Sequence, residues 1–446
     1  MMKKERSNIR WLYLGAGTLI LLFLGLIYAW SIFRTPIAEL FPDWTISQLS
    51  MTFTISISFF CLGGFAGGIM SKKMRVRARL IISAIMLLVG FFAVSLLNPS
   101  RPDMSLVMLY VFYGVFGGGG VGIAYNSVIS TVNKWFPDKV GLASGILLMG
   151  FGLGGLLLGS VVNSMIGAFG IASVFRMLAI AIAVICSAAA LIIKAPEKVD
   201  LEAAAGKIEG KTEEIQGTAD EAAVNGELAE AQETHEIKGV REVRGVQVAQ
   251  ESCDMSPSEM LKTSRFWFFA LWAVLLNSAG LLVINSAANI SLAFNGTAVM
   301  GMIVSLFNGA GRIIAGNNFD RLGRKISTVI NSGFMLFAGV FLTMGGLSGK
   351  YIFILLGLIF VGLAYGGCPT ITSAYISKAF GAWNYPTNFS IANFSLIPAA
   401  IIGPMISSTL LEASNGSYNT NFYAIIGFSL SALIMWVLLN LASDKK

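Results

Sequence analysis

Long runs of apolar residues, separated by short polar or basic stretches, occupy most of the chain. A helix needs about 20 mostly apolar residues to cross a lipid bilayer. That length rule predicts twelve membrane-spanning helices. Six are expected in the first part of the chain, at residues 11–33, 46–70, 80–97, 104–131, 142–166 and 172–194. Six more are expected in the last part, at residues 265–288, 297–319, 327–346, 351–377, 387–411 and 421–441.

The basic start of the chain and the apolar run after it have the order of elements found in a signal peptide. The run from Trp11 to Phe33 is longer than a signal-peptide core of about 7–15 residues, and no small-residue cleavage motif follows it. We therefore expect this run to remain in the protein as its first span.

The middle of the chain, residues 195–264, is different because it holds 16 of the 24 acidic residues and 7 of the 31 basic ones. Such a composition cannot bury a core, so we expect a mostly disordered linker. The run Ser256-Pro257-Ser258-Glu259 predicts a capping box and a short helix at its end. The expected division is a helical bundle over 1–194, the linker over 195–264 and a second bundle over 265–446.

Composition excludes a soluble protein, because 55% of the residues are apolar and only 12% are charged, against about 25% in soluble domains. Basic residues gather in the loops on one predicted side of the membrane. By the positive-inside rule that side is the cytoplasm, so we expect a multi-pass protein of the plasma (inner) membrane with both termini inside. The net charge of +7 then reflects topology, and the expected partner is the lipid bilayer and not nucleic acid.

A loop motif appears twice, at matching places in the two halves. After the eighth predicted span the chain reads G-x-x-x-D-R-x-G-R-K, which contains Asp320, Arg321, Gly323, Arg324 and Lys325. After the second span, Ser71 replaces the acid and Met74 the second glycine, while Lys72 and Arg75 keep the basic positions. An aspartate at a helix end can pair across a bundle with basic groups, and glycine allows a tight reversal.

Twelve spans in two sets of six, the long linker and this loop motif together resemble the major facilitator superfamily. The resemblance implies an all-α membrane protein with twelve transmembrane helices in two pseudo-twofold-related six-helix bundles. It also implies a substrate site near the membrane midplane between the bundles, exposed to each side in turn, and a gating role for the loop motif.

Several short segments resemble the oxalate/formate antiporter family within that superfamily. They are residues 28–33, 134–139, 141–145, 260–263, 365–367, 380–381 and 403–404. The resemblance implies exchange or uptake of small organic carboxylates, with an arginine in the eighth helix, here Arg312, as a fixed cation for substrate.

Arg312 also attracts attention on physical grounds, because it falls inside a span. A cation there is unfavourable unless it faces a cavity or a partner. Asn308, one helical turn earlier, shares its face. The expected role is binding of a substrate carboxylate. The alternative is a structural arginine capped by carbonyl groups or paired with an acid.

The predicted span over 387–411 contains no Lys or Arg, whereas the oxalate exchanger of the family has a lysine there. Two carboxylates favour two fixed cations, and one cation suits one carboxylate. We therefore predict a small monocarboxylate such as formate, acetate, lactate or pyruvate as substrate.

Further candidate substrate contacts are polar or aromatic residues inside spans. A tyrosine offers a flat apolar face and one hydroxyl donor, and buried asparagines offer amide groups. The alternative for all of them is helix packing. These candidates are Tyr28, Tyr125, Tyr365, Asn126 and Asn393.

Enzyme chemistry is not expected, because the single histidine, His235, lies in the linker and the four cysteines are dispersed. No cofactor or metal is expected, and we expect a monomer. None of the acids falls in the middle of a span, which favours anion exchange, or symport governed by the substrate–Arg312 pair. Two alternatives remain, a proton-coupled symporter or exporter of another small solute, and a membrane sensor with a carrier fold.

Overall fold

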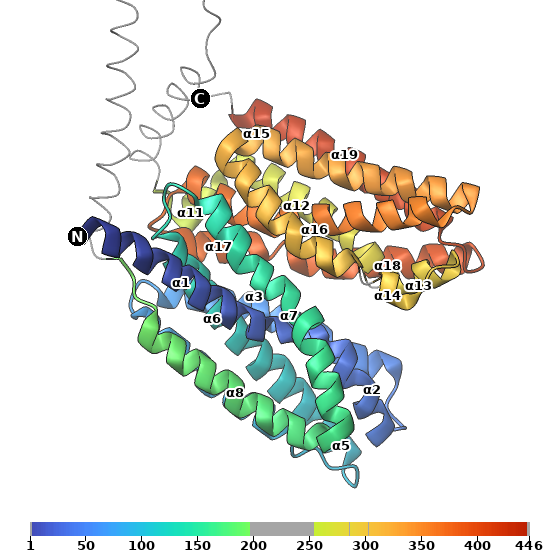
Figure 1. The fold of residues 1–446 in the computed structure, drawn as a ribbon, viewed down its shortest axis with the longest axis horizontal. Coiled ribbons are helices and arrows are strands. Elements are labelled where there is room, and N and C mark those ends of the chain that lie inside the picture. The colour runs from blue at the N-terminus through green and yellow to red at the C-terminus, as the bar shows by residue number, and fades with distance from the viewer. Residues whose placement is uncertain (1, 197–253, 285, 302, 444–446) are drawn as a thin grey trace, which may run out of the picture.

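In a computed structural model, the protein is helical over most of the described residues, which are 2–196, 254–284, 286–301 and 303–443 (Figure 1). The helices of the N-terminal half are α1 (Met2–Leu24), the 3-10 helix η1 (Gly25–Ala29), α2 (Trp30–Leu40), α3 (Ile46–Met70), α4 (Val76–Val94), α5 (Pro102–Met108), the π-helix η2 (Leu109–Gly117), α6 (Gly118–Asn133), α7 (Val140–Phe169) and α8 (Ile171–Ile192). Those of the C-terminal half are α11 (Pro257–Lys262), α12 (Ser264–Ile284), α13 (Ala287–Ala293), α14 (Ala298–Gly301), α15 (Ile303–Ser348), α16 (Tyr351–Phe380), α17 (Tyr385–Asn393), α18 (Leu396–Ala413) and α19 (Asn419–Ser443).

The prediction of twelve spans is confirmed, although one pair of spans is continuous. Within the described residues, eleven helical stretches are long and apolar enough to cross a membrane. One of them is α15, whose 46 residues contain the non-helical Gly323 with φ of 74° and ψ of 179°. A glycine adopts this positive φ without a steric penalty. The break at Gly323 divides α15 into two spans, and the total becomes twelve.

Three spans depart from the straight α-helices that apolar periodicity predicts. The first span continues through the η1 turn into α2 and ends at Leu40 rather than at residue 33. The fourth passes through the π-helix η2 between α5 and α6. The eleventh is divided into α17 and α18. Hydrophobicity along the sequence reports burial in lipid or protein, and it does not distinguish α, 3-10 and π turns.

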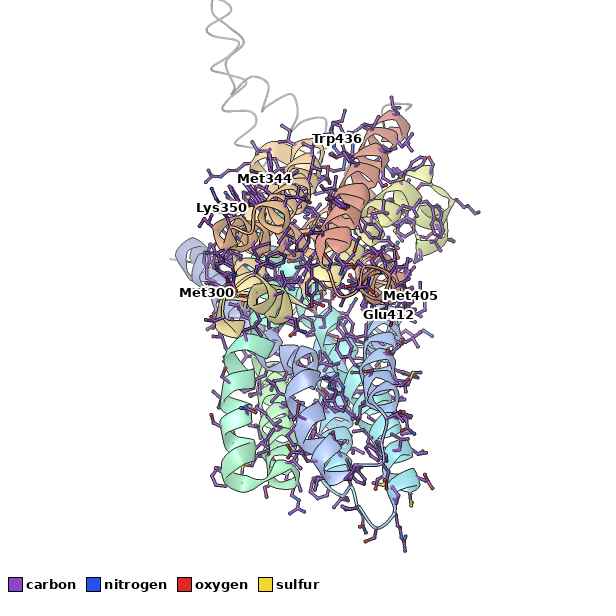
Figure 2. The ribbon with its side chains drawn as sticks, turned by 90° about the vertical axis from the view of Figure 1, so that its right-hand side faces the viewer. Met300, Met344, Lys350, Met405, Glu412 and Trp436 are labelled. Atoms are coloured by element: carbon purple, nitrogen blue, oxygen red, sulfur yellow. The ribbon has the colours of Figure 1, made fainter. Side chains whose placement is uncertain are left out.

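The two halves form two bundles that lie against each other (Figure 1). The helices from α1 to α8 group on one side of the picture and those from α11 to α19 on the other. We call the side of the molecule that carries the N-terminus and the loops at 71–75, 134–139 and 381–384 the terminal side. Lys350 and Glu412 lie on the opposite side, which faces the viewer in Figure 2.

Glycines let helices within a bundle approach closely. A Cβ atom added to Gly118 or Gly122 of α6 would collide with the backbone carbonyls of Ser56 and Phe60 in α3. This small-residue packing is typical of membrane helices, whose association depends on close van der Waals contact. It fixes α6 against α3 and thereby positions Tyr125 and Asn126.

The short helix α11 follows the capping box over residues 256–259. The Ser256 hydroxyl accepts a hydrogen bond from the Glu259 backbone N–H at 3.3 Å, and the Glu259 carboxylate accepts one from the Ser256 N–H at 2.7 Å. The expectation of disorder in the linker falls on residues 197–253, which lie outside the described residues.

Candidate functional site

Arg312 lies between the two halves and is held by both. It belongs to the first segment of α15, and only 5% of it is exposed. Its Nε–H donates to the Asn308 side-chain oxygen at 3.2 Å, and its Nη1 donates to the Leu148 carbonyl of α7 at 2.5 Å. The guanidinium of the C-terminal half is therefore bonded to the backbone of the N-terminal half. Asn308 and Arg312 interact across one helical turn, as their spacing predicts.

Two of the three predicted tyrosines lie near this guanidinium. Arg312 interacts electrostatically with both Tyr125 of α6 and Tyr365 of α16. The Tyr365 ring packs against Gly280 of α12, where a side chain would not fit. A cation and an amide of one half thus lie near two phenols, one from each half, and such a set of groups suits a small anion.

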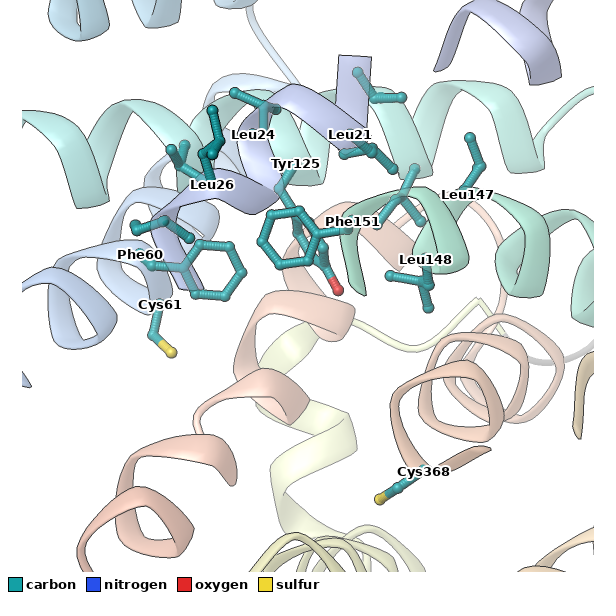
Figure 3. Close-up of a cluster of buried hydrophobic side chains, with 14 of the residues drawn as sticks. Leu21, Leu24, Leu26, Phe60, Cys61, Tyr125, Leu147, Leu148, Phe151 and Cys368 are labelled. Atoms are coloured by element: carbon teal, nitrogen blue, oxygen red, sulfur yellow. The ribbon is translucent and has the colours of Figure 1, made fainter. Parts of the chain in front are cut away.

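The Tyr125 ring is fixed by other aromatic rings. Its centroid lies 4.8 Å from that of Phe151 and 5.0 Å from that of Phe60, and Phe389 of the other half stacks on it at 6.2 Å. Figure 3 shows Tyr125 with Phe60 and Phe151, and the Tyr125 hydroxyl points away from Leu21 and Leu24 and toward the helices of the C-terminal half. The apolar packing leaves the hydroxyl as the polar end that faces the interface.

Asn126 and Asn393 lie at contacts between the two halves. The Asn126 side chain donates to the Pro386 carbonyl at 2.7 Å and to the Ser390 hydroxyl at 2.6 Å. The Asn393 carbonyl accepts a long contact from the Cys61 thiol at 3.7 Å. These contacts join α6 and α3 to α17. The side chain of Tyr28 lies outside the described residues.

Asp320 of the loop motif caps a helix of the opposite half. Its carboxylate accepts hydrogen bonds from the backbone N–H groups of Gly141 at 2.8 Å and Leu142 at 2.7 Å, in the first turn of α7. The cap position of that helix, Lys139, provides no side-chain bond. Lys378 lies 4.0 Å from the same carboxylate. Because a helix N-terminus carries a partial positive charge, an aspartate stabilises it.

The basic residues of the motif have several different surroundings. Arg324 lies over the ring of Tyr375, with the guanidinium carbon 5.7 Å from its centroid. Arg321 is exposed, and the Lys325 carbonyl accepts a bond from Trp436 at 2.8 Å. The motif therefore combines an inter-half cap at Asp320 with the reversal at Gly323.

The matching loop after α3 has no such cap. Ser71, at the position of the acid, donates its hydroxyl proton to the Gly68 carbonyl of its own helix at 2.6 Å. Lys72 and Arg75 are exposed. Arg79, which the sequence analysis did not single out, is buried and donates to the Gly67 carbonyl at 3.4 Å. The two loops resemble each other in sequence but make different contacts. Ser71 is uncharged, so it cannot stabilise a helix N-terminus through a negative charge as Asp320 does.

A buried polar network that the sequence did not reveal joins the halves between Arg312 and the terminal side. The Asn133 side chain donates to Ser144 at 2.8 Å and to Ser373 and Tyr385 at 3.3 Å. The hydroxyls of Ser144 and Ser373 lie 2.8 Å apart, and those of Ser373 and Tyr385 lie 2.6 Å apart. The only signal in the sequence is the polarity of these residues inside apolar runs, which packing explains equally well.

Close backbone contact accompanies these hydrogen bonds. Gly141 of α7 and Gly316 of α15 meet so tightly that a Cβ on either would collide with the carbonyl of the other. Together with the Asp320 cap and the Asn133 network, this contact closes the interface from Arg312 toward the terminal side.

Comparison with known proteins agrees with this architecture. The family model of the Major Facilitator Superfamily matches residues 18–396 and 268–446. The oxalate:formate antiporter of Oxalobacter formigenes is 25% identical over 447 residues, which cover 98% of this chain and 93% of the antiporter. The apicoplast pyruvate carrier 1 of Toxoplasma gondii is 35% identical over 97 residues, which cover 22% of this chain and 17% of the carrier.

The fold is also that of solved transporters. The proton:xylose symporter XylE superposes with a TM-score of 0.69 over 97% of this chain and 95% of its own, at 15% sequence identity. The relatives and structural neighbours are transporters rather than enzymes. The chain is a multi-pass membrane transporter, and it belongs to the major facilitator superfamily.

Proposed function

We propose that the protein carries a small organic monocarboxylate across the membrane by alternating access, with Arg312 as the fixed cation that binds the carboxylate. The observation that supports this most directly is the position of Arg312, which is buried between the halves and grouped with Asn308, Tyr125 and Tyr365. A buried cation is unfavourable unless it is paired, and a carboxylate is its natural partner in a water-filled cavity.

The substrate class follows from the number of cations. The described spans α17 and α18 contain no lysine or arginine, so the eleventh helix contributes no second positive charge. A guanidinium binds one carboxylate through two parallel hydrogen bonds. The relatives named as an oxalate:formate antiporter and a pyruvate carrier transport small carboxylates and support the same class.

The contacts between the halves suggest how binding and movement are connected. We infer that the terminal side is cytoplasmic, in the plasma membrane, and that the present conformation is closed on that side. Opening it separates α7 from α15, which removes the Leu148 carbonyl from Arg312. A carboxylate on the guanidinium replaces that partner, whereas in an empty carrier the guanidinium would lose it without replacement. This difference favours exchange of anions over one-way release.

Transport by purified protein in liposomes tests the proposal. We expect uptake of formate, acetate, lactate or pyruvate that is faster when a monocarboxylate is present on the other side, and we expect weaker transport of oxalate. A preference for oxalate would contradict the proposed substrate class. Intact transport by Arg312→Ala would instead favour a proton-coupled carrier of another solute.

Deletion of part of the linker distinguishes a carrier from a sensor with a carrier fold. A protein that lacks residues 200–250 should keep its transport rate if the function is transport alone. Loss of a cellular response, with transport unchanged, would favour the sensor.

A further inference from the structure

Gly152 of α7 lies directly against the guanidinium of Arg312. A Cβ atom added at Gly152 would stand 2.8 Å from Cζ and 2.9 Å from both Nε and Nη2. Real Cβ atoms do not approach other heavy atoms so closely. All three of the nearest atoms belong to the guanidinium, so the missing side chain provides the space in which this group lies.

Neighbouring glycines of the same helix serve other contacts. The nearest atom to Gly145 is the backbone carbonyl of Arg312, and the nearest atom to Gly154 is the carbonyl of Leu22 in α1. Gly167, farther along α7, has open space where a Cβ would be. Close helix packing therefore explains Gly145 and Gly154, but at Gly152 the closest contact is to a charged side chain.

The surroundings of Gly152 show what this space achieves. Leu148, whose carbonyl accepts the Arg312 Nη1 bond, precedes Gly152 by one helical turn and faces the same way. The side-chain oxygen of Asn308 accepts the hydrogen bond from Nε at 3.2 Å. The cation is thus held between the carbonyl of Leu148, the amide of Asn308 and the bare backbone of Gly152, where it reaches across from one half to the other.

We propose that Gly152 is a positioning residue of the anion site, because it provides the space that lets the Arg312 guanidinium lie against α7. This inference rests on the proposed role of Arg312 in binding a carboxylate. A methyl group at position 152 would displace the movable end of an arginine rather than a helix backbone. The helix would remain in place while the guanidinium would lose its bond to Leu148 and its orientation toward substrate.

Thermal unfolding tests the contact itself, independently of any substrate. Gly152→Ala and Gly167→Ala are compared in the wild-type protein and in Arg312→Ala. Alanine is the better helix former, so Gly167→Ala should leave the Tm unchanged or raise it in both backgrounds. Gly152→Ala should give a lower Tm than Gly167→Ala when Arg312 is present, and the same Tm effect as Gly167→Ala when Arg312 is absent. If Gly152→Ala changed the Tm equally in both backgrounds, the proposed contact between Gly152 and Arg312 would be wrong.

Transport kinetics test the consequence for binding. Loss of one oriented charge-assisted hydrogen bond should raise the apparent KM for formate by about tenfold in Gly152→Ala. The maximal rate should fall less than the KM rises, and Gly167→Ala should match the wild type. A KM equal to that of Gly167→Ala would overturn the positioning role. If the wild type transported no carboxylate, the proposed function would fail. The unfolding comparison would still show whether Gly152 contacts the Arg312 guanidinium.

Discussion

The carboxylate of Asp320 accepts a hydrogen bond from the backbone N–H of Gly141 at 2.8 Å, so a side chain of one half caps a helix of the other. This bond exists only while α7 and α15 are together at the terminal side. It therefore stabilises the conformation that is closed there, and any change that weakens it should favour opening.

Asp320→Asn should increase opening of the terminal side, because it removes the negative charge that stabilises the first turn of α7. Cys61 is buried between α3 and α17, with its thiol 3.7 Å from the Asn393 carbonyl, and it reports opening through its alkylation by a maleimide. In a protein whose other cysteines are serine, we expect the reaction to accelerate by about fivefold to tenfold. Asp138→Asn, which removes an acid paired with Arg10 within one half, is the control. Equal rates in the two variants would contradict this account.

Gly141→Ala should disrupt the same closure through sterics. The new Cβ would collide with the Gly316 carbonyl and lie 2.8 Å from the Asp320 carboxylate oxygen. Because backbone atoms cannot move aside as a side-chain end can, the alkylation of Cys61 should accelerate at least as much as in Asp320→Asn. Gly333→Ala in α15 has open space at its Cβ and should react like the unmodified protein. A slow reaction in Gly141→Ala would show that the two helices do not need this close approach.

Tyr385→Phe should destabilise the closed interface, because it removes a hydroxyl that lies 2.6 Å from Ser373 and 3.3 Å from Asn133. Buried groups that lose a hydrogen-bond partner are destabilising by about 1–3 kcal/mol. Thermal unfolding in detergent should show a lower Tm than in Tyr423→Phe, whose tyrosine is 50% exposed. Equal Tm values for the two variants would show that the Tyr385 hydroxyl does not stabilise this interface.

The capping box at α11 should respond to acid. Hydrogen bonds from the Ser256 backbone and side chain lower the pKa of the Glu259 carboxyl. A depressed pKa means that this contribution to stability is full above the ordinary glutamate pKa of about 4.3 and is lost as the pH falls through the lower value of the folded state. Hydrogen exchange at the Ser256 amide should therefore accelerate in acid beyond its intrinsic pH dependence. Glu259→Gln, which does not titrate, should show no such additional change.

The spans were predictable because membrane helices need long apolar runs, and the expected runs fall on the eleven span-length stretches of the described residues, one of which is divided in two at Gly323. The sequence also placed Arg312 and Asn308 on one helix face, and that pair forms a hydrogen bond. These features depend on local periodicity, which a single sequence shows directly.

The contacts between the halves were not predictable, because they depend on which residues meet across the interface. The bonds that Asn126 donates to Pro386 and Ser390 are one example. Asp320 was expected to pair with basic residues; it lies 4.0 Å from Lys378, and it also caps backbone amides of α7, which the sequence does not indicate. The sequence does not distinguish Gly152 from the other glycines of the spans, although the guanidinium of Arg312 lies against it. Backbone groups and empty space leave no chemical signature in a sequence.

Uptake of labelled formate into liposomes by the wild type, Arg312→Lys and Arg312→Gln tests whether Arg312 binds the substrate carboxylate. Lysine keeps the charge but loses the bidentate geometry of the guanidinium, and glutamine loses both. We expect a graded loss, with Arg312→Lys retaining part of the exchange rate and Arg312→Gln retaining almost none. Formate exchange by Arg312→Gln at the wild-type rate would contradict the assignment of the substrate carboxylate to Arg312.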